Sequence, residues 1–226
     1  MFFSFDYQPY IAIIADIKNS RKIKDRNEVQ KKLRRVLEGI NQQYHNDTCS
    51  RFTITLGDEF QGLLRNGANT MHIIADIERQ MHPIKMRFGI GVGDIRTEVI
   101  KEMSIGADGP VYHNARKAID ILKEDEKRNQ TNPADIRLEV DGAENQAVTE
   151  MINVILSLMT AIKELWSDRQ REIIWDMVEH QVSQTDLAKR LGITQPSVQK
   201  SLSKGKYYTY KKGMDMVHKA LEEIRR

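Results

Sequence analysis

The sequence predicts an α+β protein in which a ferredoxin-like domain, with a split βαβ sheet, precedes an all-α domain. Segments typical of strands occur only before residue 142, and segments with helical periodicity separate them. Their order is β-α-β-β-α-β, followed by one more helix and one more strand, which is the split βαβ arrangement. Beyond residue 142 only helical patterns remain.

The first predicted domain covers residues 1–142. Its opening strand is an apolar run that ends at Asp16, which is typical of a buried strand. The dipeptide Gly57-Asp58 indicates a tight hairpin between the second and third strands. The strands are predicted at 10–16, 51–56, 59–64, 86–93 and 135–140, and the helices at 27–44, 68–81 and 111–122. Residues 124–132 lack apolar side chains and are expected to form a surface loop.

Residues 143–166 are predicted to form a connecting helix. Apolar side chains recur there at alternating spacings of three and four, the a/d pattern of a coiled coil, at Val148, Met151, Ile155, Leu158, Ile162 and Leu165. Two interpretations stay open. The helix either packs on its own domain or joins two copies of the chain into a homodimer.

Residues 167–226 are predicted to form an all-α domain with a helix-turn-helix. Gly192 permits the left-handed turn between two short helices, and Thr194 can cap the second, where Pro196 is tolerated in the first turn. The helices are expected at 169–179, 184–191, 196–203 and 213–224. The outward positions carry hydrogen-bonding and cationic side chains, which suit contacts to bases and phosphates of duplex DNA. The predicted DNA-binding residues are Gln184, Thr185, Thr194, Gln195, Ser197, Lys200, Ser201, Lys204 and Lys206.

The charge of the chain favours the same location for a DNA-binding surface. The net charge is only +3, but residues 181–213 hold seven Lys and Arg against one acid. The first 140 residues are nearly balanced, so a nucleic-acid surface is expected near the C-terminus. The basic residues of this stretch are Lys189, Arg190, Lys200, Lys204, Lys206, Lys211 and Lys212.

Composition excludes several other classes of protein. The single cysteine, Cys49, cannot form an intrachain disulfide, which favours a reducing interior. The N-terminus lacks the pattern of a signal peptide, and no apolar window is long enough for a membrane span. The six histidines do not follow zinc-binding spacings. A cytoplasmic protein without a membrane partner is therefore expected.

Two carboxylates are predicted to meet at one edge of the sheet. Asp16 ends the first strand and Asp58 lies at the hairpin tip. With the Ile17 carbonyl they would form an all-oxygen site that suits Mg²⁺ or Mn²⁺. Arg116, one turn into a helix, is expected to contact a transferring phosphoryl group. The residues expected to bind the phosphates of a nucleotide are Lys18, Asn19, Ser20, Gly57, Glu59 and Arg116.

Four motifs follow one another along residues 10–122. They are Asp16-Ile-Lys-Asn-Ser20, Gly57-Asp-Glu-Phe60, Gly89-Ile-Gly-Val-Gly93 and Val111-Tyr-His-Asn-Ala-Arg116. In this order they resemble the catalytic core of class III nucleotidyl cyclases and the related palm domain of diguanylate cyclases. The resemblance implies a nucleotidyl-cyclase-like fold, metal ligation at Asp16, Ile17 and Asp58, and phosphate binding at Arg116.

The chain departs from the cyclase pattern at three positions. Tyr112 stands where the cyclases have asparagine, Ile54 replaces the lysine that selects adenine, and Leu56 replaces the first glycine of the diguanylate cyclase hairpin. The resemblance therefore does not extend to the choice of base or to catalytic turnover.

The second domain carries a resemblance of its own. Asp168-Arg-Gln-Arg-Glu172, the segment from Gln184 to Thr194, and Ser197-Val198 resemble the helix-turn-helix of sigma-factor region 4 and of LuxR-type regulators. A short cyclase-like domain followed by a helix-turn-helix resembles the SatD family.

Two functions are compatible with these features. The first is a DNA-binding transcription regulator whose cyclase-like domain binds a nucleotide or phosphate ligand with a divalent metal. The alternative is a minimal nucleotidyl cyclase or nucleotidyltransferase that uses Mg²⁺ or Mn²⁺ and a nucleoside triphosphate, with a helix-turn-helix tail. A third interpretation treats the first domain as a degenerate dimerisation module. The first two both imply a homodimer.

Overall fold

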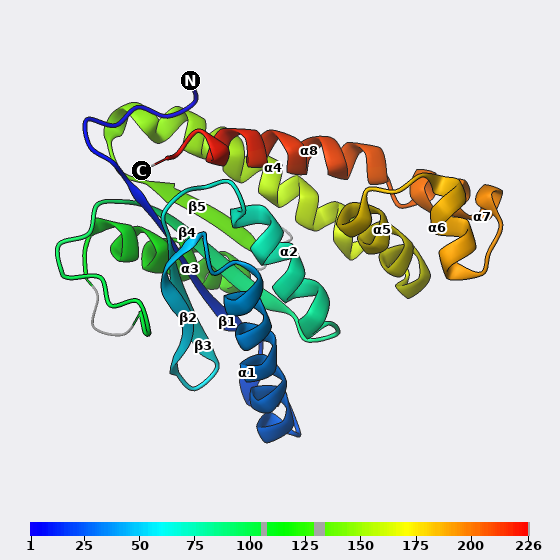
Figure 1. Ribbon diagram of the computed structural model, residues 1–226, viewed down its shortest axis with the longest axis horizontal. Coiled ribbons are helices and arrows are strands. Elements are labelled where there is room, and N and C mark those ends of the chain that lie inside the picture. Colours follow the sequence, from blue (N-terminus) through cyan, green and yellow to red (C-terminus); the bar gives the residue numbers. More distant parts are fainter. Residues whose placement is uncertain (105–107, 129–133, 226) are drawn as a thin grey trace.

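The computed structural model describes residues 1–104, 108–128 and 134–225 (Figure 1). Within these residues five strands form one sheet, in the order β2-β3-β1-β4-β5. Neighbouring strands are antiparallel, except that β5 is parallel to β4. The strands are β1 (Tyr10–Ile17), β2 (Thr48–Leu56), β3 (Glu59–Leu64), β4 (Met86–Gly93) and β5 (Ile136–Val140). Because β3 lies between β1 and β2, the two strands that the first long helix connects, the order is that of a split βαβ unit.

Eight α-helices and two short 3-10 helices occur in the described residues, which confirms the predicted α+β class. The 3-10 helices are η1 (Ser20–Lys22) and η2 (Ala143–Asn145). The α-helices are α1 (Arg26–Gln43), α2 (Thr70–Met81), α3 (Pro110–Arg128), α4 (Gln146–Glu164), α5 (Asp168–His180), α6 (Gln184–Leu191), α7 (Gln195–Lys204) and α8 (Tyr207–Glu222). A helix long and apolar enough to cross a bilayer does not occur among the described residues.

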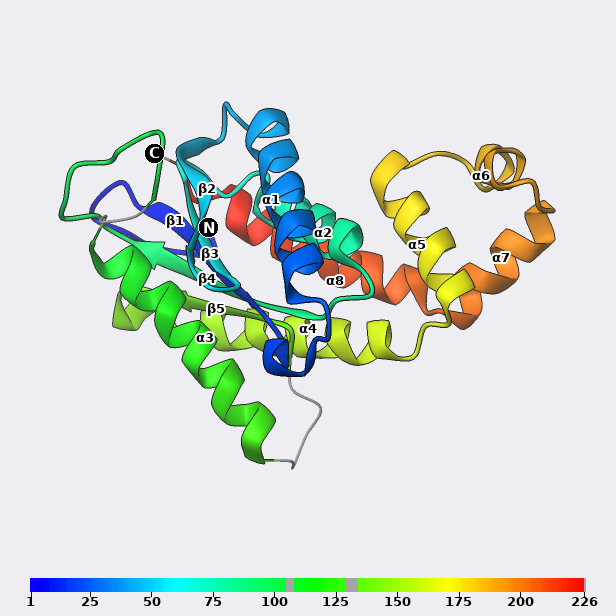
Figure 2. The same ribbon diagram turned by 90° about the horizontal axis from the view of Figure 1, so that it is seen from below.

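Both faces of β1 are buried, so its alternating side chains belong to two different cores. Ile11, Ile13 and Ile17 pack in the main core with α1 and α2, whereas Ala12 and Ile14 pack against α3. Figure 2 shows α1 and α2 on one side of the sheet and α3 on the other. Since successive side chains of a strand point to opposite faces, Asp16 lies on the α3 side.

Two glycines of β4 let α3 lie directly on the strand backbone. A Cβ atom at Gly91 would stand 2.1 Å from the carbonyl oxygen of Val111, and one at Gly89 would stand 2.3 Å from that of Ala115. Only glycine fits at such a close approach of a helix to a strand. The same packing carries the later turns of α3 past Arg87, at the start of β4.

The helix α3 is longer than predicted. The expected surface loop at 124–132 is wrong as far as Arg128, where α3 ends, and residues 129–132 lie outside the described residues. Lys, Glu and Arg are good helix formers. In addition, the Glu126 carboxylate accepts hydrogen bonds from Arg87. A highly charged segment can thus continue a helix when one of its acids has a buried partner.

The helix α4 packs on its own chain, against β5 and α8. Its buried face contains Ile152, Leu156 and Met159. This face is rotated from the a/d positions that the sequence predicts. Asn153 also seals the sheet edge, because its side chain donates to the Leu138 carbonyl at 2.9 Å and accepts from the Leu138 amide at 2.8 Å. Of the six a/d residues, Val148, Ile155 and Ile162 are partly buried against the main core, whereas Met151, Leu158 and Leu165 are exposed.

The helices α5, α6 and α7 form a group beside the sheet domain, and α8 returns along α4 (Figure 1). The expected start of the last helix at residue 213 is wrong, because α8 begins at Tyr207. Tyr207 and Tyr210 are buried, so these tyrosines pack in the core. Trp166 is buried at the junction between α4 and α5, and its indole donates to the Gly205 carbonyl at 2.7 Å.

Candidate functional site

A cavity of about 710 Å³ opens where β1 ends, beside the β2–β3 hairpin. Its lining includes the three predicted metal ligands, Asp16, Ile17 and Asp58. Four predicted phosphate-binding residues also line it, namely Asn19, Ser20, Gly57 and Glu59. Lys18 and Arg116 do not line this cavity. The fold thus brings together seven predicted residues that are up to about forty positions apart in the chain.

The carboxylate of Asp16 is held by two cations. Its Oδ1 lies 2.5 Å from Nη1 of Arg87, and its Oδ2 lies 2.8 Å from Nζ of Lys123. Arg87 is the residue opposite Asp16 in the β1–β4 register, where side chains on one face of the pair meet. Lys123 reaches the same carboxylate from α3. The side chain of Asp16 is only 9% exposed.

These contacts define how a divalent ion would fit. Asp58 has no hydrogen bond or ion pair among the described residues, so its carboxylate is free to bind a cation. Two carboxylates and the Ile17 carbonyl are the hard oxygen donors that Mg²⁺ prefers. The described residues contain no group of three or more His, Cys, Asp or Glu placed to hold a metal. An ion at this position would therefore need substrate oxygens or water as well, and would compete with Lys123 for Asp16.

Glu59 and Arg116 form a separate pair beside the cavity. Both Nη atoms of Arg116 donate to the Glu59 carboxylate, which also accepts from Thr55. Burial raises the pKa of Glu59, but the hydrogen bonds and charge of Arg116 outweigh that effect and hold it below its ordinary value. The guanidinium of Arg116 is thereby fixed on the hairpin, with 41% of its side chain exposed.

Lys18 does not take the part expected from the sequence. Its backbone amide donates to the Lys85 carbonyl at 2.9 Å. Its ammonium lies 2.9 Å from Glu126 and 2.6 Å from Asp135. Neither group is free for a phosphate, because both already have partners at the start of β4 and around α3. Asn19, in the left-handed region with a φ of 53°, turns the chain from β1 into η1.

Five cationic residues of the cavity were not identified from the sequence. They are Arg21, Lys22, Arg26, Arg87 and Lys123. Two of them had a recognisable signal. Arg87 opposes Asp16 once the strands are paired, and Lys123 follows Arg116 by seven residues, which places both on one side of α3. The relation of Arg87 to Asp16 depends on the sheet order, whereas the spacing of Lys123 from Arg116 can be read along the chain.

The comparison with protein families identifies the group to which the chain belongs. The family model described as the SatD family matches residues 10–218. The chain belongs to the SatD family. The expected membership is therefore confirmed. No curated protein was found to match this SatD-family chain.

Solved structures similar to this SatD-family chain include nucleotidyl cyclase domains. The guanylyl cyclase domain of the RhoGC fusion protein from the aquatic fungus Blastocladiella emersonii is 17% identical over 49% of this chain and 74% of that one, with a TM-score of 0.39. A bacterial light-regulated adenylyl cyclase is 16% identical over 65% and 79%, with a TM-score of 0.41. The guanylate cyclase domain of RhGC from Catenaria anguillulae in complex with GTP is 17% identical over 49% and 71%, with a TM-score of 0.35.

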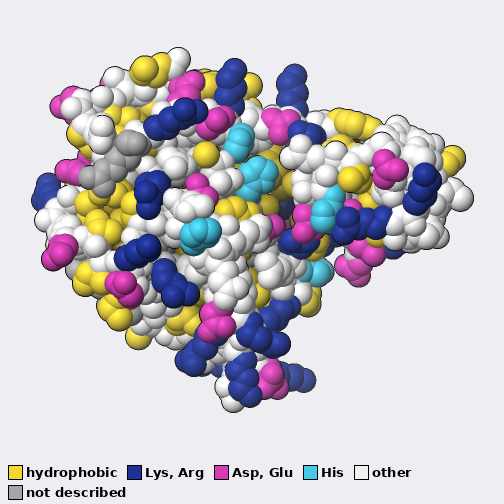
Figure 3. All heavy atoms as spheres, viewed as in Figure 1, with side chains coloured by type: hydrophobic (Ala, Val, Ile, Leu, Met, Phe, Trp, Pro, Cys, Tyr) yellow, Lys and Arg dark blue, Asp and Glu magenta, His cyan; other side chains and the backbone are white. Residues whose placement is uncertain are grey.

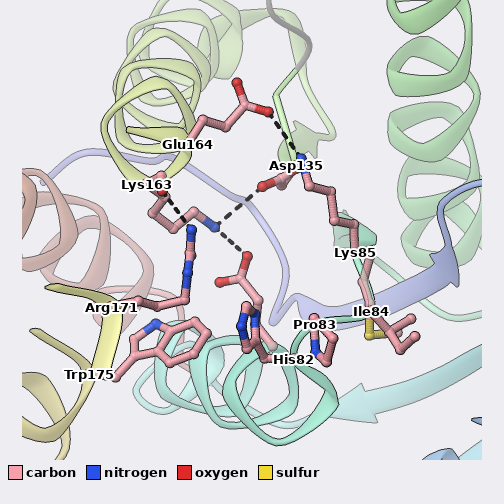
Figure 4. A pocket seen from close by; sticks show the side chains of 11 residues that line it. His82, Pro83, Ile84, Lys85, Asp135, Lys163, Glu164, Arg171 and Trp175 are labelled. Carbon is pink, nitrogen blue, oxygen red and sulfur yellow. Dashed lines mark hydrogen bonds and ion pairs between the residues drawn. The ribbon is translucent and has the colours of Figure 1, made fainter. Parts of the chain in front are cut away.

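A chain of ion pairs leads from the cavity to the C-terminal helices of this SatD-family protein. Arg87, which holds Asp16, also binds Glu126, and Glu126 binds Lys18 at 2.9 Å. Lys18 continues to Asp135 at 2.6 Å, and the other oxygen of Asp135 lies 3.5 Å from Nζ of Lys163 in α4. Lys163 also pairs with Glu78 of α2 (Figure 4). The series is continuous from β1 to the end of α4.

The end of this series lines a second cavity of about 250 Å³, between α2, α4 and α5 (Figure 4). Lys163 is buried there. Burial lowers its pKa, but the charges of Glu78 and Asp135 outweigh that effect and raise it, so the ammonium stays charged. Arg171 of α5 donates to the Lys163 carbonyl at 2.9 Å and packs on the rings of Trp166 and Trp175. The last turn of α4 is thus tied to α5.

The residues predicted to bind DNA are spread over α6, α7 and the start of α8. Lys200, Lys204 and Lys206 are exposed and have no ion pair among the described residues. Gln195 donates to Gln184 at 2.8 Å. Thr185 is exposed and Ser201 is half-buried.

Thr194, one of these residues, and Gly192, in the turn before it, each have a local structural role. Thr194 is the N-cap of α7, and its hydroxyl accepts from the Ser197 amide and lies 2.8 Å from the Ser197 hydroxyl. Gly192, with a φ of 63°, makes the turn between α6 and α7, as expected from the sequence.

Proposed function

We propose that the cavity beside Asp16 and Asp58 binds a nucleoside triphosphate together with Mg²⁺ or Mn²⁺. One observation supports this most directly. Three carboxylates, of which Glu59 is paired with Arg116, and five cationic side chains line the same space. Such a mixture suits a phosphate chain, whose oxygens contact the cations while a divalent ion bridges them to the acids.

The chemistry that this arrangement supports best is that of a nucleotidyl cyclase or nucleotidyltransferase. A hydroxyl oxygen would attack the α-phosphorus of the nucleotide, and pyrophosphate would leave. Asp16, Asp58 and the Ile17 carbonyl would hold the metal, which when bound supplies positive charge to the reacting phosphate and lowers the pKa of the attacking hydroxyl. Arg116, fixed by Glu59, is suited to stabilise charge on the phosphoryl group.

Incubation of the chain with each of the four nucleoside triphosphates and Mg²⁺ or Mn²⁺, followed by product analysis, tests this activity. We expect a cyclic or transferred nucleotide together with pyrophosphate. Asp58→Asn should abolish the product, whereas Asp6→Asn, at an exposed aspartate outside the cavity, should not. If the wild type binds a nucleotide but forms no product, the proposed catalytic activity is wrong, and the domain only binds the nucleotide as a ligand.

A second function is supported by α6 and α7. The short turn at Gly192 and the unpaired lysines of α7 suit a helix-turn-helix that binds duplex DNA, as in a transcription regulator. In this proposal residues 1–142 form the cyclase-like domain, residues 143–166 the connecting and dimerisation helix, and residues 167–226 the DNA-binding domain. Within residues 167–226, α8 packs against α4 and against α2 of the cyclase-like domain.

DNA binding is tested with Lys200→Ala combined with Lys204→Ala. Loss of two phosphate contacts should weaken binding to duplex DNA and reduce the salt slope of log K by about 1.8. Lys219→Ala, at an exposed and unpaired position on α8, is the matched control. If the double variant binds DNA with the wild-type slope, α7 is not the DNA-contacting helix.

A further inference from the structure

The outer side of η1 and α1 carries a concentration of positive charge. Residues 21–38 hold eight Lys and Arg but only three acids, Asp25, Glu28 and Glu38, which leaves +5. Figure 3 shows Lys and Arg side chains gathered over the lower part of the molecule, where α1 lies. The first 140 residues are nearly balanced in charge, so their net charge does not reveal the local excess of positive charge at residues 21–38.

Most of these cations have no acidic partner. Lys31 pairs with Glu28 at 2.8 Å, and Lys32 donates to the carbonyls of Met81 and His82. The other six are exposed and form no ion pair with any described residue. We call them the basic ridge: Arg21, Lys22, Lys24, Arg26, Arg34 and Arg35. Other cations of the sheet domain, such as Lys18 and Lys117, have carboxylate partners.

The ridge has a fixed orientation because α1 is anchored by its opposite side. Leu33, Val36, Leu37 and Ile40 are buried in the main core. The apolar side of this amphipathic helix is therefore unavailable to a lipid surface. The ridge segment also contains no exposed large hydrophobic residue, whereas helices that bind membranes insert apolar side chains. The exposed side of this segment therefore offers positive charge without apolar side chains, which suits binding of a polyanion in water.

We infer that the basic ridge binds the phosphate backbone of duplex DNA, without regard to sequence. From Arg26 to Arg35 the helix rises about 14 Å at 1.5 Å per residue. At about 3.6 residues per turn Arg26 and Arg35 project from opposite sides of α1, so Arg34 and Arg35 are the exposed pair that faces a duplex together. Duplex DNA carries one phosphate charge per roughly 1.7 Å of its axis, so neighbouring phosphates lie within reach of this pair. Arg21, Lys22 and Arg26 also line the 710 Å³ cavity, so the ridge begins at the mouth of the candidate nucleotide site.

The test uses the full chain with Lys200→Ala and Lys204→Ala already in place, so that α7 does not contribute. Binding to a 24-base-pair duplex of arbitrary sequence is followed by fluorescence anisotropy between about 50 and 200 mM NaCl. Arg34→Gln with Arg35→Gln should lower the salt slope by about 1.8. Over this range the parent then loses about tenfold more affinity than the variant. Arg96→Gln with Lys101→Gln removes two exposed cations outside the ridge that form no ion pair within the part of the chain that the structure describes, and should leave the slope unchanged.

Three outcomes would overturn the inference. The first is an unchanged slope in the ridge variant, and the second is an equal loss in the ridge and control variants. The third is ridge-dependent sedimentation with phosphatidylserine–phosphatidylcholine vesicles in the absence of DNA binding. Circular dichroism melting checks that each variant is folded, and Lys24→Gln with Arg35→Gln provides a second ridge variant. The inference does not depend on the role of α7, because the ridge is tested against a parent chain that already lacks Lys200 and Lys204.

Discussion

The carboxylate of Asp16 illustrates how a single residue can be recognised in the sequence but not understood from it. Its position at the end of an apolar strand is visible in the sequence. Its two partners are not, because Arg87 and Lys123 lie 71 and 107 positions away along the chain. In the folded protein the ammonium of Lys123 pairs with Oδ2 of Asp16, an oxygen that a bound metal would also use.

We therefore predict that Lys123→Gln increases the stabilisation of the protein by Mg²⁺ alone. With the competing ammonium removed, a divalent ion gains the Oδ2 atom of Asp16. Saturation to a hundred times the dissociation constant would add about 2.7 kcal/mol. Urea unfolding with and without Mg²⁺ measures the difference. Lys127→Gln, one turn further along α3 and without an ion pair to any described residue, is the control. Equal effects of Mg²⁺ on all variants, Asp16→Asn included, would exclude a metal site at Asp16.

The ion pairs of Asp135 predict how stability depends on pH. Burial raises the pKa of Asp135, but the charges of Lys163 and Lys18 outweigh it and hold the pKa below its ordinary value near 4. A lowered folded pKa adds stability that is present above about pH 4 and is lost as the pH falls through the folded pKa. Asp135→Asn should therefore flatten the decline in the free energy of unfolding between about pH 5 and 2. An unchanged pH profile in urea unfolding would contradict this.

At the scale of the element, α4 shows the limit of periodicity as a guide to packing. The a/d pattern correctly predicts a long helix, but both sides of α4 are partly apolar. Tertiary contacts with β5 and α8 use Ile152, Leu156 and Met159. This leaves Met151, Val154, Leu158 and Leu165 between 59% and 80% exposed. A monomer seldom leaves such a row uncovered, and a second copy of this helix would cover it.

We predict that Met151→Asp with Leu158→Asp converts a homodimer into a folded monomer, measured by light scattering coupled to size exclusion. Charges on this outer row oppose association without touching the core. Leu156→Asp is the contrasting variant, since its side chain is 1% exposed and the change should unfold the chain. A wild-type protein that is already monomeric at micromolar concentration would contradict the dimer.

At the scale of the whole molecule, the ion-pair series joins the cavity to the C-terminal helices. Its members come from β1, β4, α3, α4 and α2, and most are shielded from solvent. Paired buried charges are costly to separate. A ligand that draws Asp16 away from Arg87 would therefore shift the balance along the whole series, as far as the joint where Arg171 binds the last turn of α4.

We predict that a nucleoside triphosphate with Mg²⁺ changes the affinity of the chain for duplex DNA, by about fivefold or more. Glu126→Gln should bring this ratio toward one, because it breaks the link between Arg87 and Lys18. Glu124→Gln, at an exposed i,i+4 pair with Arg128, should retain it. Fluorescence anisotropy of labelled DNA with each nucleotide provides the ratio. A ratio that is equal in wild type and Glu126→Gln would show that the series does not transmit ligand binding.

Local patterns in the sequence determined the class of the fold, the order of the elements and seven of the residues that line the 710 Å³ cavity. Strand alternation, helix caps and the turns at Gly57 and Gly192 act between near neighbours, so they are legible along the chain. Asp16, Ile17 and Asp58 could be chosen because each sits at the end or tip of such an element.

Only the tertiary structure decided which groups these residues meet. Arg87 and Lys123 reach Asp16 because β4 lies beside β1 and glycines let α3 lie close upon β4. The same long-range packing extended α3, buried one side of α4 rather than the other, and left the cations of the ridge without acidic partners among the described residues. Charge and burial depend on neighbours in space. The fold determines which residues become neighbours, and these long-range contacts cannot be read from one sequence.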